Sequence, residues 1–230
     1  MAGLNYTTRD KALWIALLAL CLASAAAYVL WALPAMPETV PTHWGADGAA
    51  DGWGDKGSTL FMGVAMPLLM LALLFAVPHL DPRGGSFNHF KGIYQGFSAA
   101  FTVFMVVAAW ITPLSALGAL PTTGVPIVNI IVFGFMGLLL VGLGIVMPRI
   151  EPNYTFGVRL PWTLADPENW RRTHRFAGPV FVVMGVATVA SALFSSTAPE
   201  LMLVAMLVAL LGGVALVALY SFLLWKGAVR

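Results

Sequence analysis

Apolar runs of about 20 residues recur along this chain, and they limit its fold more than any other feature. As a helix, a run of this length crosses roughly 30 Å of hydrocarbon. We place six such runs, at residues 11–33, 60–80, 93–118, 125–148, 175–196 and 200–225. Only 10% of the residues are charged, whereas about 25% is usual in soluble domains. The sequence therefore predicts an all-α integral membrane bundle of six transmembrane helices.

Lysine and arginine side chains predict how this bundle is oriented. Of the 12 cations, Lys56 alone falls on one face of a six-span protein. The others are Arg9, Lys11, Arg83, Lys91, Arg149, Arg159, Arg171, Arg172, Arg175, Lys226 and Arg230. Because cytoplasmic loops carry an excess of lysine and arginine, both termini are expected on the cytoplasmic side of a cell membrane. The small net charge of +2 gives no reason to expect nucleic acid as a partner.

Two long loops suggest a division of the chain into two membrane regions. Residues 1–92 are expected to form an N-terminal region with a structured extracytoplasmic loop at 34–59. Residues 93–230 are expected to form a second region with a cytoplasmic loop at 149–175. We look for function in these two loops, because the spans themselves are nearly all apolar.

The extracytoplasmic loop is expected to fold into a compact lid. Its three prolines exclude a regular helix, and its Asp-Gly pairs predict tight turns. Tryptophan is enriched at membrane interfaces, which suits Trp44 and Trp53. Oxygen ligands near a histidine suggest a metal site, but their spacing is not that of an EF-hand. The candidate residues of this loop are His43, Trp44, Asp47, Asp51, Trp53 and Lys56.

The segment 153–175 is a dense polar and aromatic stretch with four arginines, a histidine and two tryptophans. Asp166 and Pro167 predict a helix start, because aspartate is a strong N-cap and proline suits the first helical position. A helix that begins there places Trp170 and His174 one turn apart on one face. The fifth span is expected to continue this helix, so that the segment becomes a cytoplasmic docking and coupling element.

Glycines crowd the third and fourth spans, where they predict close helix packing. They are Gly92, Gly96, Gly134, Gly137, Gly142 and Gly144. Because glycine lets two helix backbones approach closely, such glycines commonly mark packing faces, and this is their expected role here.

Two patterns together resemble the SdpI immunity-protein family. The pattern in the second half comprises Asn153, Gly157, Arg159, Pro161, Trp162, Thr163, Trp170, Thr173, His174 and Arg175. The pattern in the first half comprises Pro41, His43, Trp44, Gly45, Asp51, Gly52, Trp53, Gly54 and Lys56, and it resembles a small domain of unknown function often found ahead of the other. The resemblance covers roughly residues 30–90 and 145–195.

The resemblance implies an integral membrane protein for immunity and signal transduction. The founding member of that family protects a bacterium against a secreted toxic peptide and sequesters a cytoplasmic repressor at the membrane. The implied partners are thus membrane lipid, an antimicrobial peptide and a transcriptional repressor. The implied functional positions are Asn153, Gly157, Arg159, Pro161, Trp162, Trp170, His174 and Arg175.

Two alternatives remain open. A small transporter or peptide exporter fits six spans that divide into two groups of three with opposite orientation. However, all 10 acids lie in loops or at span ends, whereas proton relays usually keep an ionisable group at membrane depth. A membrane metalloprotein using His43, Asp47 and Asp51, or His174 with nearby acids, lacks a recognised catalytic spacing. We therefore expect no enzymatic activity, no cofactor and no metal.

Overall fold

The computed structural model describes residues 5–122 and 126–228, and these contain six helices long and apolar enough to cross a membrane. The spans are Thr8–Ala35, Lys56–Leu80, Lys91–Ala116, Ile127–Arg149, Pro167–Phe194 and Pro199–Trp225. The prediction of an all-α membrane bundle with six transmembrane helices is therefore confirmed. Arg230 and residue 125, the predicted start of the fourth span, lie outside the described residues.

The spans are built from α-helices joined by short irregular turns. The helices are α1 (Thr8–Ala27), α2 (Leu33–Ala35), α3 (Met66–Leu80), α4 (Lys91–Ala116), α5 (Ile127–Val146), α6 (Pro161–Ala165), α7 (Pro167–Phe194) and α8 (Pro199–Trp225). A π-helical turn, Tyr28–Ala32, joins α1 to α2, and another, Phe61–Ala65, precedes α3. The predicted start at Asp166 and Pro167 is confirmed, because the Asp166 carboxylate accepts a hydrogen bond from the Glu168 N–H at 2.9 Å.

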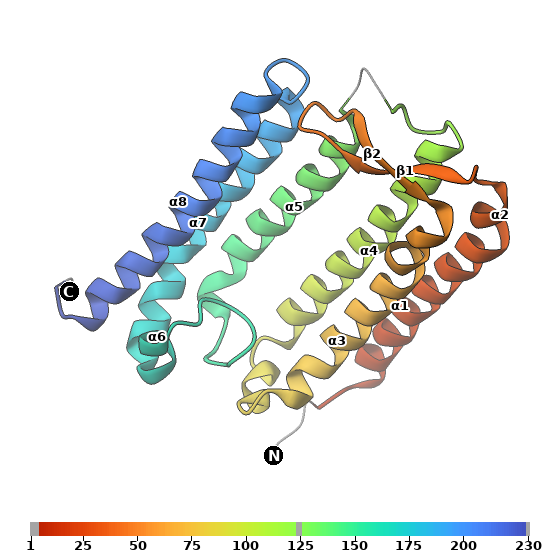
Figure 1. Cartoon of the computed structure of the whole chain (residues 1–230). Helices are drawn as coiled ribbons and strands as arrows, with labels where there is room; N and C mark the ends of the chain where they lie inside the picture. Colours follow the sequence, from red (N-terminus) through yellow and green to blue (C-terminus); the bar gives the residue numbers. More distant parts are fainter. Residues whose placement is uncertain (1–4, 123–125, 229–230) are drawn as a thin grey trace.

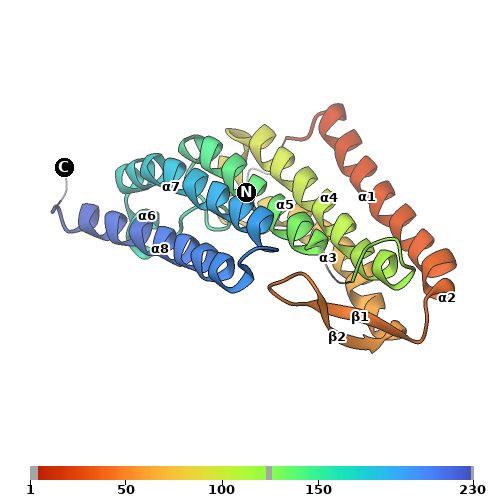
Figure 2. The same cartoon turned by 90° about the horizontal axis from the view of Figure 1, so that it is seen from above.

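The helices form two groups of three that lie side by side (Figures 1 and 2). The first half contains α1, α3 and α4, and the second half contains α5, α7 and α8. The α4 and α5 helices adjoin at the boundary between the halves. Large apolar side chains point outward around the bundle, for example Leu30 at 78% and Leu211 at 69% exposure. Such exposure suits contact with lipid, so the bilayer covers the apolar surface that water would disfavour.

A β-hairpin covers one end of the bundle, which we call the hairpin end (Figure 1). Strand β1 (Thr39–Trp44) pairs antiparallel with β2 (Ala50–Asp55), with irregular register after Pro41. The Asn129 side chain of α5 holds its turn by donating to the carbonyl oxygens of Ala46 at 2.8 Å and Gly45 at 3.3 Å. We predicted a compact lid here but no strands. Two-stranded pairing tolerates a proline because each strand keeps a free edge.

Glycines separate into two classes that the sequence did not distinguish. A Cβ at Gly137 would lie 2.6 Å from the Gly185 carbonyl oxygen, and one at Gly144 would lie 2.6 Å from that of Gly178. These pairs let α5 and α7 pack backbone to backbone, as predicted. The prediction was wrong for four others, since a Cβ there would meet nothing within 4 Å. These four are Gly92, Gly96, Gly134 and Gly142.

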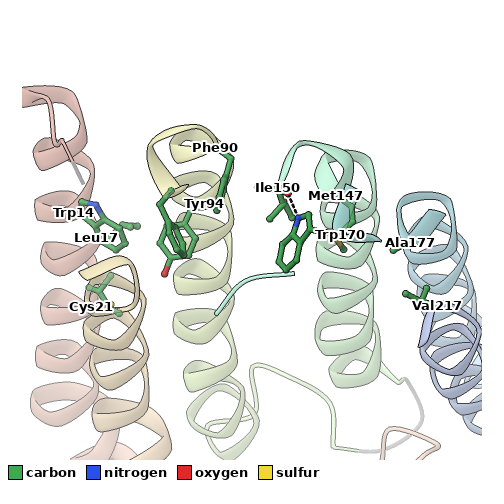
Figure 3. Close-up of a cluster of buried hydrophobic side chains, with 12 residues drawn as sticks. Trp14, Leu17, Cys21, Phe90, Tyr94, Met147, Ile150, Trp170, Ala177 and Val217 are labelled. Carbon is green, nitrogen blue, oxygen red and sulfur yellow. Dashed lines mark hydrogen bonds between the residues drawn. The ribbon is translucent and has the colours of Figure 1, made fainter. Parts of the chain in front are cut away.

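A cluster of buried side chains gathers at the end opposite the hairpin (Figure 3). It joins Trp14 and Leu17 of α1, Phe90 and Tyr94 next to or on α4, and Trp170 of α7. Because members come from both halves, this cluster packs the two groups of helices against each other. The cluster also packs against residues 153–175, the polar and aromatic segment described above.

Candidate functional site at the motif end

Residues 149–175, which we call the motif segment, fold at the end opposite the hairpin, here called the motif end (Figure 1). Asn153 organises its first turn and is fully buried. Its amide nitrogen donates to the carbonyl oxygens of Glu151 at 2.8 Å and Phe156 at 2.9 Å. Its amide oxygen accepts from the N–H groups of Thr155 at 3.0 Å and Phe156 at 2.6 Å. All donor and acceptor positions of this side chain are therefore used to shape the backbone.

The imidazole of His174 is locked between two backbone groups. Its Nδ1 lies 2.9 Å from the Trp170 carbonyl oxygen, and its Nε2 lies 3.1 Å from the backbone nitrogen of Val158. A carbonyl oxygen can only accept and an N–H can only donate, so Nδ1 carries the proton and Nε2 accepts. His174 is 1% exposed. It is a neutral structural residue in this state, with no free nitrogen to hold a metal or transfer a proton.

Gly157 makes this contact sterically feasible. Its φ angle is +108°, and a Cβ on it would lie 2.5 Å from His174 Nε2. Both the left-handed backbone and the close approach of the imidazole require the absence of a side chain. The sequence pattern thus places a glycine where the loop passes over the histidine.

Trp170 completes the buried part of the site. Its indole Nε1 donates to the Ile150 carbonyl oxygen at 2.7 Å (Figure 3). Its ring stacks on His174 with a centroid distance of 4.1 Å, which agrees with the predicted one-turn spacing on α7. The indole therefore ties the end of the fourth span to the start of the fifth.

The short helix α6 attaches the motif segment to α8. Pro161 begins α6, and the Trp162 indole donates to the Ser221 hydroxyl at 2.6 Å and stacks on Trp225. Asn169 of α7 donates to the Ser221 carbonyl oxygen at 3.0 Å. Sequence reasoning missed Ser221 and Asn169, because nothing local marks a serine in an apolar span as the partner of a distant tryptophan.

A carboxylate from the first half holds the motif segment from the other side. Asp81, which ends α3, is 5% exposed. Its Oδ2 accepts from the Tyr154 N–H at 2.9 Å and the Thr155 hydroxyl at 2.7 Å. Arg83 donates to the Leu164 carbonyl oxygen at 3.3 Å and lies over the Tyr154 ring at 4.9 Å. Sequence reasoning did not select either residue, although an acid at a span end was a usable signal for Asp81.

Four of the five arginines of the motif segment are exposed and form a basic rim next to this buried scaffold. Arg159 is exposed, although its guanidinium group donates a hydrogen bond to the Tyr154 carbonyl oxygen at 3.1 Å. Arg171 pairs with Glu168 at 2.6 Å, and Arg175 is also exposed. The structure thus separates the predicted site residues into a buried scaffold and a basic surface that anionic groups can reach.

The candidate residues at the hairpin end form paired contacts instead of a metal cage. His43 Nδ1 contacts the Asp51 carboxylate, and Asp47 accepts from the Ala49 N–H at 3.0 Å. Lys56 pairs with Glu38 at 3.0 Å. Within residues 5–122 and 126–228, no group of three or more His, Cys, Asp or Glu side chains is arranged to hold a metal ion.

The two hairpin tryptophans differ in their surroundings. Trp53 is 57% exposed, whereas Trp44 is half-buried and its indole Nε1 has no partner in the described part of the chain. The exposed ring of Trp53 is available to a membrane interface or to a ligand at the hairpin end.

Comparison with known proteins agrees with the two-part pattern. Residues 149–221 match the SdpI/YfhL protein family, and residues 19–71 match a domain of unknown function, DUF1648. Immunity protein SdpI of Bacillus subtilis (strain 168) is 27% identical over 212 residues, which cover 92% of this chain and 95% of that protein. The second half of the chain is therefore similar to the SdpI/YfhL family, and nearly the whole chain is similar to an immunity protein of that name. The SdpI/YfhL match contains the whole buried scaffold and α8 up to Ser221.

The DUF1648 match contains the hairpin and the π-helical turns on either side of it. Asp81 lies outside both matches, although its carboxylate accepts a hydrogen bond from Thr155 inside the SdpI/YfhL match. No solved structure is significantly similar to this chain.

Proposed function

We propose that this protein is a membrane immunity protein that gives its cell resistance to a toxic, antimicrobial peptide. The observation that carries the proposal is the similarity to Immunity protein SdpI, which extends over 92% of this chain. Similarity along nearly the full length includes both the hairpin and the motif segment. A partial match to either region alone would not support a shared activity.

The arrangement of the two ends supports a receptor that works across the membrane. We propose that the hairpin, with Trp53 exposed, meets the peptide outside the cell. The exposed arginines Arg159 and Arg175 then form a basic docking surface for a cytoplasmic repressor. The buried scaffold of the motif segment contacts both halves through Asp81 and Ser221, so a movement between halves would reach this surface.

A sensitive strain tests the immunity proposal. The chain is expressed in Bacillus subtilis that lacks its own SdpI, and the cells are challenged with their native toxic peptide and a panel of membrane-active peptides. Restored growth is expected with the wild-type chain. Unchanged sensitivity across the whole panel, with the protein present in the membrane, contradicts the proposal.

Separate variants test the two ends. Trp53→Ala is expected to weaken resistance, whereas the double variant Arg159→Gln and Arg175→Gln is expected to keep resistance and lose recruitment of the repressor. Resistance is measured as growth in the presence of the peptide. Recruitment is measured as the amount of repressor that is isolated together with the tagged chain from the membrane fraction. A peptide exporter is the alternative. If the purified chain alone moves peptide across the membrane of proteoliposomes, the result favours an exporter.

A further inference from the structure

A groove runs between α4 and α5, where the two halves of the bundle adjoin. It has a volume of about 520 Å³ and an almost entirely apolar lining. One wall contains Gly92 and Gly96 of α4, and the other contains Gly142 of α5. A Cβ at any of these glycines would meet nothing within 4 Å, so the glycines face open space and not a neighbouring helix.

The groove occupies one half of the membrane depth. It begins at Gly92 and Val146, the second residue of α4 and the last of α5, and so opens at the motif end. At its far end the Phe104 and Phe135 rings stack across the boundary at 5.1 Å. The α5 wall from Phe135 to Val146 is about 17 Å long at 1.5 Å per residue. This length is close to half of a hydrocarbon core of roughly 30 Å.

The length decides between two apolar occupants. A transmembrane helix crosses the full hydrocarbon depth, so the Phe104–Phe135 stack would block its path halfway. An acyl chain of one leaflet ends near the bilayer midplane and fits a groove that closes there. We infer that the groove holds an acyl chain of an anionic phospholipid from the leaflet at the motif end.

Charge at the mouth of the groove favours an anionic headgroup. Arg149 lies one turn beyond Val146, is exposed, and has no hydrogen bond or ion pair among residues 5–122 and 126–228. Lys91, next to Gly92, already pairs with Asp10 at 2.6 Å. Of the two cations next to the groove residues in sequence, Arg149 is therefore the one that remains for a phosphate.

The lipid would also touch the structure that supports the motif segment. Phe97 lines the groove and contacts Phe156 of the motif segment with a ring distance of 5.1 Å. An acyl chain against Phe97 would therefore fill the space between α4 and α5 and support the loop that Phe156 belongs to.

Native mass spectrometry of the full chain tests this site. The purified protein in detergent is offered phosphatidylglycerol or phosphatidylcholine with identical acyl chains. The wild type is expected to retain phosphatidylglycerol, and Gly142→Leu, which fills the groove, is expected to lose it. Gly134→Leu is the matched control, because it adds the same side chain to open space on the same helix outside the groove. Gly96→Leu fills the groove from the opposite wall and should reproduce the loss.

The headgroup is tested separately with Arg149→Gln. Removing one cation near the surface is expected to lower the preference for phosphatidylglycerol about fivefold. Equal retention by Gly142→Leu and the wild type, or equal loss in Gly134→Leu, overturns the site. Equal retention of the two lipids by the wild type overturns the anionic headgroup. Lipid retention is measured on purified protein, so the result does not depend on whether the protein confers immunity.

Discussion

Asp81 of the first half accepts a hydrogen bond from the Thr155 hydroxyl of the motif segment at 2.7 Å, across 74 positions of sequence. The same carboxylate accepts from the backbone N–H groups of Tyr154 at 2.9 Å and Arg83 at 2.7 Å. One buried side chain thus fixes the end of α3 and the first turn of the motif segment together.

Asp81→Asn replaces one carboxylate oxygen by an amide NH₂ group, which would face the N–H and O–H donors that the carboxylate now accepts from. The variant is therefore expected to destabilise the protein by about 1–3 kcal/mol. The measurement is thermal unfolding in detergent. Asp166→Asn is the matched control: asparagine caps a helix about as well as aspartate, so this change should be nearly neutral. Equal melting temperatures for the two variants would show that the contact between halves contributes nothing to stability.

Local features of the fold could be predicted from the sequence. The six spans follow from apolar length, and the start of α7 follows from Asp166 and Pro167. The stacking of Trp170 on His174 follows from their spacing on one helix. Each of these three features depends on residues within a few helical turns of each other, so the local sequence pattern is sufficient to predict it.

Contacts between distant segments could not be predicted in the same way. The hairpin was missed because β1 contains Pro41 and its pairing depends on cross-strand partners. The glycine prediction was wrong for four of the six positions, because close packing requires a second helix at that face. Gly144 has α7 against it, whereas Gly142, two residues earlier and so on a different face, lines the groove.

Gly157→Ala is expected to disrupt the motif segment more than an equivalent change elsewhere. Gly118 shares the left-handed backbone, with φ of +77°, but a Cβ there meets nothing within 4 Å. Gly118→Ala therefore measures backbone strain alone, about 1–2 kcal/mol. Gly157→Ala adds a clash with His174 Nε2 and should cost clearly more. Thermal unfolding of both variants gives the comparison, and equal losses would mean that the loop moves away from the imidazole at no cost.

Gly144→Ala is expected to separate α5 from α7. Its Cβ would lie 2.6 Å from the Gly178 carbonyl oxygen and 2.8 Å from the Val182 nitrogen. Overpacking of this kind costs about 1–3 kcal/mol. Gly142→Ala on the same helix meets nothing and should change stability by less than about 1 kcal/mol. The prediction fails if the two alanine variants unfold at the same temperature.

Cysteine labelling tests the orientation that the cations predict. Cys21 is the single cysteine and is buried, so Cys21→Ala provides a background without an accessible thiol. Thr42→Cys then places a thiol on the hairpin, and Ala165→Cys places one on α6, both at exposed positions. Because arginine and lysine gather on the cytoplasmic side, the hairpin is expected outside and the motif segment inside. A membrane-impermeant maleimide should label the cysteine at position 42 in intact cells, and the one at 165 only after the membrane is opened. The reverse pattern would place the basic rim outside the cell, where it could not dock a cytoplasmic repressor.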